Sequence, residues 1–576
     1  MLLTMAMKSP TRTLGLATPH AAATEAGRAA FAAGGNAVDA ALAACATLTV
    51  VYPHMCSIGG DAIALVHAPD GGVTCVNGSG AAPLALDAAR VRAAIERQPT
   101  PLTRTGMPER GPHTVTVPGV LAAWETLREL GARFDLARLL KPAIGFARDG
   151  CTVSRSLAAT LAWEPDLFAA DAGLRGIFFA TEGRAAVHAA AARPLDVGDV
   201  FVQPALAISL EAIARDGVGA FYKGALGGDY VAGLRALGSV MTRDDLARHE
   251  TDVCEPLLID AFGYEFLTAP PNSQGYVLLQ IMAARALTES AAGNLTVAET
   301  ARLFALVGEE RDRHLCDPRG QPMPLEELLD PAHVRALLDR AQGRGSGTPT
   351  DERERSGDSP GERRTREAGG DAGSGDTIAC VAADSEGWAV SIIQSVYHGF
   401  GSAILEPRTG IVAHDRGACF SLDPSSPNLI AGGRRPLHTL MPLLVLRDGR
   451  LTVVAGTMGG EAQPQIHAQI LERVLAARAE RTPADADGAA TPITPDVLAA
   501  ALAGPRWIWD EGTLWAEADV PADHLTDLRT TGMPLTLLDR LDESVGHGQY
   551  VAVQSGTPTA AASDPRSDGD AIVAVL

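Results

Sequence analysis

Residues 377–402, TIACVAADSEGWAVSIIQSVYHGFGS, mark the point at which the character of this 576-residue chain changes. Two strand-like runs, TIACVAAD and WAVSIIQSVY, are joined by the short turn SEG, a pattern that predicts a β-hairpin. Further along, PLLVLRDGRLTVVAGTMGG repeats the scheme around Asp448-Gly449. From Thr377 onward the chain therefore reads as a β-sheet layer flanked by helices.

The tract before this hairpin has nothing to bury. Residues 343–376 contain no Val, Ile, Leu, Met, Phe, Trp or Tyr. Such a segment cannot offset the entropy lost when it becomes ordered. We predict a flexible linker over residues 343–376, which separates a region of residues 1–342 from a region of residues 377–576.

The first region is expected to be mostly helical. Between Thr18 and Val66 the pattern predicts a helix, a loop, a second helix and a strand, with Asn36 as the cap of the second helix. From about Gly119 to Ala341 the periodicity is again mostly helical.

Composition limits the functional classes. With 46% hydrophobic residues the chain can bury a large core, and a net charge of −21 argues against a nucleic-acid binder. No run approaches the roughly 20 apolar residues that span a bilayer, and we recognise no secretory signal, so a soluble cytoplasmic protein is expected.

The candidate metal ligands lack the spacing of a metal site. The eight cysteines form no CxxC pair and indicate reduced, scattered thiols. His54 with Cys56, and His314 with Cys316, do not have the paired spacing of a structural zinc site. We predict neither a metal nor another cofactor.

A threonine at the start of the hairpin has two readings. A threonine hydroxyl is a poor nucleophile unless a base lies nearby, and the α-amine of an N-terminal threonine can be that base. The pKa of a free α-amine is about 7.7–8.0, which leaves a neutral fraction near neutral pH. Thr377 would become such a residue if the chain were cut before it. Alternatively, Thr377 is only the first residue of a strand, where β-branched residues are favoured.

The hairpin resembles the start of the small subunit in the γ-glutamyltransferase (γ-glutamyltranspeptidase) family of N-terminal-nucleophile hydrolases, which begins at a catalytic threonine. Further segments of that family occur in order along nearly the whole chain: GGNAVDAALAA, SIGGDAIALVH, HTVTVPGVLAAWETL, LLKPAIGFARDG, APPNSQGYVLLQIM, RRPLHTLMPLLVLRDGR and GTMGGEAQPQI. The resemblance implies an α+β fold, a four-layer αββα sandwich formed jointly by a large and a small subunit. It also implies autocatalytic cleavage between Asp376 and Thr377.

The resemblance assigns roles by position. Thr377 would be the nucleophile, Ser395 a hydroxyl that assists it, and the pair Gly459 and Gly460 the oxyanion hole. Adjacent backbone N–H groups can point at one developing negative charge when no side chain intrudes. His438 and Thr439 would take the place of two serines that hold the substrate's α-carboxylate in γ-glutamyl enzymes.

Three departures concern the substrate. Ser79 lies near the place of the family's carboxylate-binding arginine, Tyr397 replaces an asparagine, and Cys419 replaces the aspartate that binds the substrate's amine. The losses remove charge-assisted contacts to a glutamyl group. IIQSVYHGFGS and GTMGGEAQPQ look more like the branch that includes oxamate amidohydrolase and acylase-type relatives. In that reading the acyl pocket is lined by four polar residues: Tyr397, His398, Arg416 and His438.

Three functional hypotheses follow. The first is an autoprocessing amide hydrolase or acyltransferase that forms an acyl-enzyme on Thr377 and acts on a small acidic amide such as oxamate. The second is a true γ-glutamyltransferase or glutathione hydrolase. The third is an uncleaved, non-catalytic scaffold. The first two imply a small-molecule substrate and two associated fragments, with no nucleic-acid or membrane partner.

Overall fold

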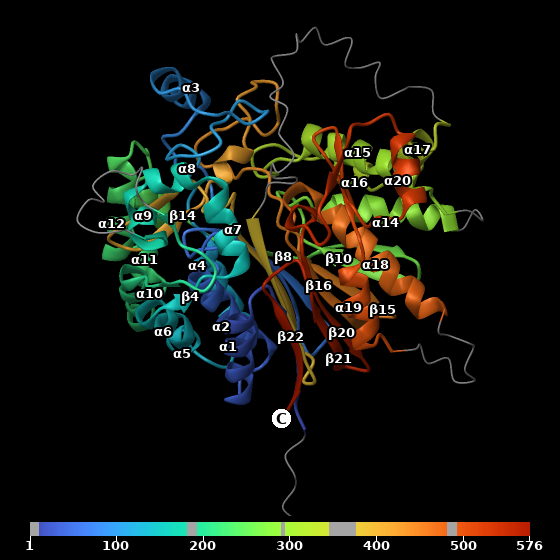
Figure 1. The fold of residues 1–576 in the computed structure, drawn as a ribbon, viewed down its shortest axis with the longest axis horizontal. Coiled ribbons are helices and arrows are strands. Elements are labelled where there is room, and N and C mark those ends of the chain that lie inside the picture. The colour runs from blue at the N-terminus through green and yellow to red at the C-terminus, as the bar shows by residue number, and fades with distance from the viewer. Residues whose placement is uncertain (1–10, 181–192, 290–293, 345–375, 481–491) are drawn as a thin grey trace, which may run out of the picture.

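Two β-sheets lie face to face in the middle of the molecule, and helices cover the outer face of each sheet (Figure 1). This computed structural model describes residues 11–180, 193–289, 294–344, 376–480 and 492–576. The arrangement is the α+β, four-layer αββα sandwich that the resemblance implies.

The first sheet interleaves strands from both sides of Thr377. Its spatial order is β22 (Asp570–Val575), β1 (Thr13–Thr18), β11 (Asp376–Asp384), β12 (Ala389–Tyr397), β2 (Asp61–His67), β3 (Val73–Asn77) and β8 (Asp252–Cys254). The predicted hairpin is confirmed as β11 and β12, which pair antiparallel. β1 pairs with both β11 and β22, and β2 pairs with β12. The two regions of the chain therefore build one continuous sheet.

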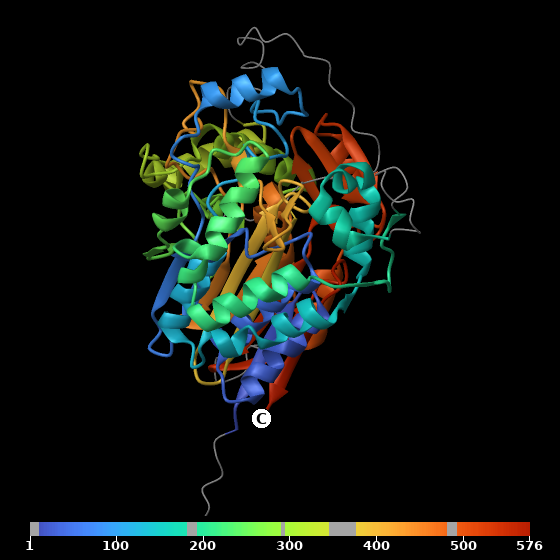
Figure 2. The same ribbon diagram turned by 90° about the vertical axis from the view of Figure 1, so that its left-hand side faces the viewer.

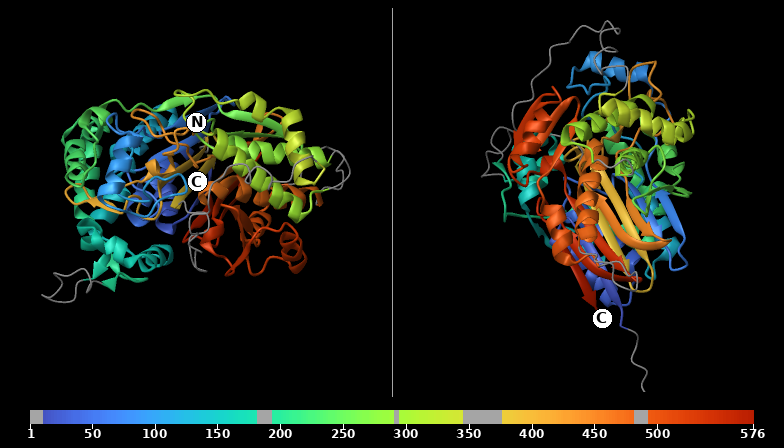
Figure 3. Two further views of the ribbon diagram at one scale, coloured as in Figure 1. Left: turned by 90° about the horizontal axis from the view of Figure 1, so that it is seen from above. Right: turned by 90° about the vertical axis from the view of Figure 1, so that its right-hand side faces the viewer.

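The second sheet stacks on the first. Its spatial order is β21 (Thr557–Ser563), β20 (Gly548–Gln554), β16 (Arg450–Thr457), β15 (Leu443–Arg447), β10 (Tyr264–Thr268) and β9 (Leu257–Ala261). An apolar layer that includes Ala379, Ile393 and Val454 fills the space between the two sheets. The right-hand view of Figure 3 shows this second sheet with its covering helices.

The prediction of mostly helical structure from Gly119 to Ala341 is wrong for β8, β9 and β10. In β9 exposed and half-buried residues alternate, the period-2 pattern of a strand with one covered face. A tight turn at Phe262 and Gly263, both with positive φ, joins β9 to β10. The sequence analysis also missed β1, which precedes the first helix.

Helices from the first region cover the outer face of the first sheet, and Figure 2 views the molecule from their side. The helices of this part are α1 (Ala21–Ala32), α2 (Ala37–Val51), α4 (Val120–Gly131), α5 (Leu136–Leu139), α6 (Lys141–Asp149), α7 (Arg155–Trp163), α8 (Pro165–Ala170), α9 (Ala172–Phe178), α10 (Pro204–Asp216), α11 (Gly219–Tyr222), α12 (Ala225–Ala236) and α13 (Arg243–Ala247). Every residue of α2 is buried, and Asn36 caps it in a capping box with Asp39, as the sequence predicts.

A second helical layer covers the second sheet. It contains α14 (Gly275–Glu289), α15 (Val297–His314), α16 (Leu325–Leu328), α17 (Pro331–Ala341), α18 (Gln463–Glu480), α19 (Pro495–Ala503) and α20 (Ala522–Arg529). The left-hand view of Figure 3 shows the two helical layers on opposite sides of the sheets.

Shorter elements lie at the periphery and in connections. They are α3 (Ala88–Arg97), β4 (Cys151–Thr152) with β7 (Val200–Phe201), β5 (Phe179–Ala180) with β6 (Arg193–Pro194), β13 (Ile404–Glu406) with β14 (Ile411–Ala413), β17 (Trp507–Asp510) with β18 (Thr513–Glu517) and β19 (Leu535–Leu538), and the 3₁₀ turns Arg416–Cys419, Gly460–Ala462 and Glu543–Val545. The predicted linker of residues 343–376 lies largely outside the described residues, so the boundaries drawn there stay a prediction.

Candidate active site

Three neighbouring strands place Thr377, Ser395 and Asp61 in one row. Thr377 lies at the start of β11 and is directly opposite Ser395 of β12, which in turn is opposite Asp61 of β2. All three side chains are buried. Because directly opposed residues point to the same face of a sheet, their polar groups gather at one end of the sandwich.

The hydroxyl group of Ser395 connects this row to the peptide bond before Thr377. It donates a hydrogen bond to the carbonyl oxygen of Asp376 at 2.6 Å. It accepts one from the Thr377 hydroxyl at 3.2 Å and one from the backbone N–H of Tyr397 at 2.7 Å. The nucleophile expected from the sequence therefore lies next to the group that polarises the bond expected to break.

The backbone at Tyr397 has a strained conformation, and its N–H group is hydrogen-bonded to Ser395. Tyr397 has a φ of 82°, a conformation that costs a bulky residue about 1–3 kcal/mol. The register of β11 against β12 shifts at this point, between Asp376 and Thr377. At this irregularity in the strand pairing, the backbone N–H of Tyr397 points at the Ser395 hydroxyl and donates a hydrogen bond to it.

Arg416 brings a buried positive charge to the same place. Its guanidinium donates to the hydroxyl groups of Thr439 at 3.0 Å and Ser395 at 3.4 Å, and lies 4.3 Å from the ring centre of Tyr397. The side chain is 1% exposed, and its Nε has no hydrogen-bond partner in the described structure. Within the described residues, no carboxylate forms an ion pair with it. The buried Asp61 carboxylate is near enough that the charge of Arg416 lowers its pKa, so the guanidinium is partly compensated although no carboxylate contacts it directly.

Asp61 belongs to a buried network with two histidines. His438 accepts a hydrogen bond from the Leu440 N–H at Nδ1, so its Nε2 carries a proton and donates to Asp61 at 3.2 Å. His414 Nδ1 lies 3.7 Å from the same carboxylate oxygen. Burial alone would raise the pKa of the Asp61 carboxyl, but the two histidines and Arg416 outweigh burial and hold it at about 2.

His438 is accordingly neutral. Burial, with the nearby charge of Arg416, lowers the pKa of His438 to about 3. Both ring nitrogens of His438 are hydrogen-bonded, one to Asp61 and the other to the backbone N–H of Leu440. Neither nitrogen is therefore available to bind a substrate carboxylate in this arrangement.

His398 lies on the other side of Tyr397. Its Nδ1 is 2.5 Å from a carboxylate oxygen of Asp415, and its ring centre is 4.2 Å from that of Tyr397. The side chain is only 13% exposed. His398 therefore packs against the aromatic ring that underlies Arg416.

Gly459 and Gly460 lie beyond the end of β16, which runs toward Thr377. A Cβ on Gly456 of β16 would lie 2.8 Å from the Cβ of Ala379, two residues after Thr377. Gly459 and Gly460 have φ values of 138° and 50°, and a Cβ on Gly459 would lie 2.3 Å from the Ile466 side chain. Only glycine fits there without strain.

The side chain of Gln274 links this glycine pair to Arg416. Its amide nitrogen donates to the carbonyl oxygens of Thr439 at 2.9 Å and Gly460 at 2.8 Å. The hydroxyl of Thr439 accepts a hydrogen bond from Arg416. The Gln274 side chain therefore holds both the residue that contacts Arg416 and the glycine pair. Neither Gln274 nor Asp61 was assigned a role from the sequence; the only local signal was the position of Asp61 directly after Gly59-Gly60.

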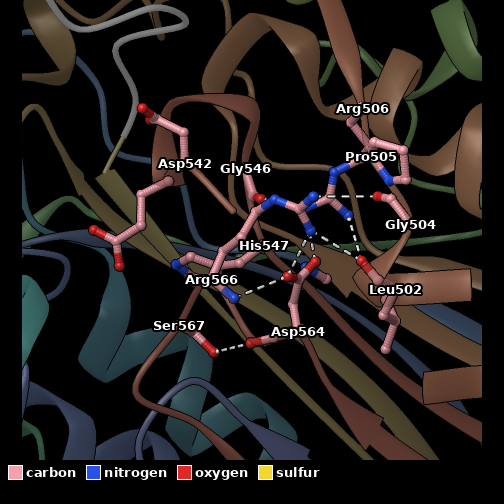
Figure 4. Close-up of polar contacts among 12 residues, drawn as sticks. Leu502, Gly504, Pro505, Arg506, Asp542, Gly546, His547, Asp564, Arg566 and Ser567 are labelled. Carbon is pink, nitrogen blue, oxygen red and sulfur yellow. Dashed lines mark hydrogen bonds and ion pairs between the residues drawn. The ribbon is translucent and has the colours of Figure 1, made fainter. Parts of the chain in front are cut away.

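Figure 4 shows a buried ion-pair cluster around Arg506 and Asp564, next to the segment of Gly546 and His547. Met458 donates its backbone N–H to the carbonyl of His547 at 3.0 Å. The preceding carbonyl, of Gly546, accepts from Arg506 at 2.5 Å, and Arg506 pairs with Asp564 at 2.7 Å. Arg506 and Asp564 are both fully buried.

The positions that depart from the family pattern are occupied by other contacts. The Ser79 hydroxyl donates to the side-chain oxygen of Asn77 at 2.7 Å and lies 3.3 Å from that of Asn272. Cys419 lies 3.7 Å from an Arg416 nitrogen, and burial raises the pKa of its thiol. Neither side chain supplies the charge that the family residue would bring.

The described residues contain neither a metal-binding cluster nor a helix that could span a membrane. Within those residues, no three His, Cys, Asp or Glu side chains are grouped so as to hold a metal ion. No helix among them is both long enough and apolar enough to span a bilayer.

Comparison with known proteins identifies the family. The family model Gamma-glutamyltranspeptidase matches residues 23–574. The oxamate amidohydrolase proenzyme of Klebsiella pneumoniae is 32% identical over 96% of this chain and 97% of its own length, and the glutathione hydrolase-like YwrD proenzyme of Bacillus subtilis is equally identical over the same shares.

Solved structures agree. The cephalosporin acylase of Bacillus halodurans superposes with a TM-score of 0.78 at 27% identity, over 99% of both chains. The matches confirm the expected N-terminal-nucleophile hydrolase fold and identify the chain as an enzyme of the amidohydrolase and acyltransferase type. This chain belongs to the γ-glutamyltranspeptidase family.

Proposed function

We propose that this enzyme cuts its own chain before Thr377 and then hydrolyses a short amide that carries a carboxylate next to the reacting carbonyl, as oxamate does. The observation that carries the proposal is the buried guanidinium of Arg416, which lies beside Ser395 and whose Nε has no hydrogen-bond partner in the described structure. The name of the Klebsiella pneumoniae relative, an oxamate amidohydrolase proenzyme, supports the same substrate class.

Autocleavage uses the contacts of Ser395. The oxygen of the Thr377 hydroxyl attacks the carbonyl carbon of Asp376, and Ser395 stabilises the charge that develops on the carbonyl oxygen. The C–N bond breaks, the hydroxyl proton ends on the released nitrogen, and an ester links Asp376 to the Thr377 side chain. Water then hydrolyses the ester, which leaves a free amine and a free hydroxyl on Thr377.

Turnover repeats this chemistry on a substrate. The α-amine of Thr377 accepts the hydroxyl proton as the oxygen attacks the amide carbonyl. N–H groups of Gly459 and Gly460 face the oxyanion, in the role that the resemblance assigns to them. Ammonia leaves, an oxalyl ester remains on Thr377, and water releases oxalate, so the net reaction is oxamate plus water giving oxalate and ammonia.

Distances favour a short acyl group. The Arg416 nitrogen and the Thr377 hydroxyl are each within 3.4 Å of the Ser395 oxygen, so they lie no more than about 7 Å apart. A carboxylate attached directly to the reacting carbonyl carbon bridges about 6 Å, and each further chain carbon adds about 1.3 Å. A γ-glutamyl group has three further carbons and would have to fold back on itself.

The alternative is a glutathione hydrolase or γ-glutamyltransferase. The name of the glutathione hydrolase-like YwrD proenzyme supports it, and this relative is 32% identical to the chain, as is the oxamate amidohydrolase proenzyme. Against it, Ser79 and Cys419 provide neither the arginine nor the carboxylate that would bind a glutamyl head group. Membership of a family of named hydrolases and acylases gives no support to the non-catalytic scaffold.

Two measurements test the proposal. A denaturing gel with N-terminal sequencing should reveal a fragment that begins TIACV. The purified protein should then release ammonia from oxamate faster than it releases the aniline from a γ-glutamyl anilide. Faster reaction with the γ-glutamyl anilide would support the γ-glutamyl alternative instead. An uncut protein that is inactive on both substrates would refute both functions.

A further inference from the structure

Cys75 and Cys254 face each other across two paired strands. Cys75 lies in β3 and Cys254 in β8, and the antiparallel register makes them direct partners. Directly opposed residues have Cβ atoms about 4.5–5.5 Å apart, and a disulfide needs about 3.5–4.5 Å. A closing movement of about 1 Å would therefore allow the two sulfur atoms to bond.

The two thiols differ in access. Cys75 is fully buried in the apolar layer between the sheets, whereas Cys254 is half-buried. β8 is the last strand of its sheet and only three residues long, so it can move more easily than a central strand. The hydrogen bond from Cys75, with help from Arg435, lowers the pKa of the Cys254 thiol, while the same contact and burial raise the pKa of Cys75.

We propose that Cys75 and Cys254 form a reversible disulfide when the folded protein meets a low-molecular-weight disulfide. The Cys254 thiolate attacks one sulfur of the small disulfide and expels its other half as a thiolate. Cys75 then attacks the Cys254 sulfur and expels the second half, and the Cys75 proton ends on a released thiol. The protein loses two protons and two electrons, and the small disulfide is reduced to two thiols.

Both strands of this pair hold the loop that carries His438. Two residues after Cys75, the Asn77 side chain donates to that of Asn272 at 2.9 Å, and the Asn272 carbonyl accepts from the His438 N–H at 2.7 Å. Opposite Asn77, Asp252 of β8 forms an ion pair with Arg435. A disulfide that draws β8 toward β3 therefore acts on both ends of residues 435–438.

A second thiol pair in the molecule supplies a matched control. Cys45 of α2 and Cys380 of β11 also lie in contact, but both are fully buried. Burial raises the pKa of Cys45 well above its ordinary value, and the Cys380 thiol faces the carbonyl of Ala41. This pair should stay reduced while the protein is folded.

The test is to incubate the folded, reduced protein with oxidised glutathione, quench in acid, alkylate under denaturing conditions without reduction, and map the peptides by mass spectrometry. We expect a linked Cys75–Cys254 peptide pair that is two hydrogens lighter, with Cys45 and Cys380 alkylated. Cys254 should react at least about tenfold faster than Cys45. In Cys75→Ser the reaction should stop at glutathione attached to Cys254.

Hydrogen exchange provides the structural readout and needs no substrate. Exchange in residues 252–254 and 435–438 should slow on oxidation, recover with reductant, and remain unchanged in Cys254→Ser. Glutathione that stays on Cys254 of the wild-type protein without closure would overturn the disulfide, and so would equal reactivity of Cys45. Unchanged exchange in residues 435–438 of the linked protein would overturn the coupling to the site.

Discussion

The hydroxyl of Ser395 donates to the carbonyl oxygen of Asp376 at 2.6 Å while it accepts from the hydroxyl of Thr377 at 3.2 Å. One small side chain therefore contacts both the attacking oxygen and the oxygen of the bond under attack. In the proposed reaction the carbonyl group of Asp376 leaves after cleavage, and a substrate carbonyl takes its place beside Ser395 and Arg416.

Thr377→Ala should abolish both cleavage and turnover, because it removes the hydroxyl that attacks the Asp376 carbonyl in the proposed reaction. On a denaturing gel the variant should run as a single band of 59.8 kDa. Thr377→Ser retains the hydroxyl and should still cut. A Thr377→Ala protein that is cut before residue 377 would show that another agent does the processing.

Ser395→Ala should slow cleavage by about 10²–10³-fold, the usual loss when one donor to a developing oxyanion is removed. The matched control is Ser391→Ala in the same strand, because Ser391 is equally buried but donates to the carbonyl of Ala455 at 2.7 Å. The fraction cut over time, followed by gel densitometry, compares the two. Equal rates in both variants would remove Ser395 from the chemistry.

Arg416→Met should lower kcat/KM for oxamate by about 10²-fold or more, since a buried charge-assisted contact to the substrate is lost. Arg416→Lys should retain part of the activity but not the forked geometry. Inhibition by oxalate should weaken in parallel. The Met variant should lose only a little thermal stability, because Arg416 makes no direct ion pair in the described structure and only its longer-range attraction to Asp61 is lost. A large loss of thermal stability would instead mark Arg416 as a structural residue.

Gly459→Ala should impair catalysis more than folding. The new Cβ would press on Ile466, and a φ of 138° strains any residue other than glycine. We expect kcat to fall with little change in KM, as measured by initial rates. Gly449→Ala, in the exposed turn before β16, also has a positive φ but meets nothing within 4 Å, so it reports backbone strain alone.

Glu543 should make stability fall as pH rises. Burial raises the pKa of this carboxyl from 4.5 to about 7, against the opposing effect of Arg155. The folded state thus favours the protonated form: the stability contribution is complete below about pH 4.5 and is lost as pH rises through about 7. The change amounts to at most about 3 kcal/mol. Thermal unfolding at pH 5 and pH 8 should give a larger drop in Tm for wild type than for Glu543→Gln, and parallel curves would contradict the assignment.

Local patterns in the sequence were sufficient for some of these features. The hairpin of residues 377–397 and the cap at Asn36 depend on neighbouring residues, and both were predicted. β1 and β8 were missed because their partners lie far away in the chain: β1 pairs with β11 and β22, and β8 with β3. β9 and β10 form a local hairpin, so there the sequence analysis overlooked a short-range signal, the alternation in residues 257–260.

The site divides in the same way. Thr377 and Ser395 received their roles from the resemblance of the hairpin to a known family, whereas the link of Asp61 to His438 spans 377 positions. Gln274 had no sequence signal because its role comes from two carbonyl groups, those of Thr439 and Gly460, which only the folded chain brings together.

The interleaving of β1 and β2 with β11, β12 and β22 has a consequence for the life of the enzyme. The proposed nick before Thr377 would leave each piece hydrogen-bonded along whole strands of the other, so we expect the halves to stay together without a covalent bond. Complete melting is different, since the uncut chain can re-form its sheet alone, whereas two pieces must first find each other in solution. Recovery from heat should therefore depend on protein concentration after maturation but not before it, and the mature enzyme would owe its lifetime to a slow rate of opening.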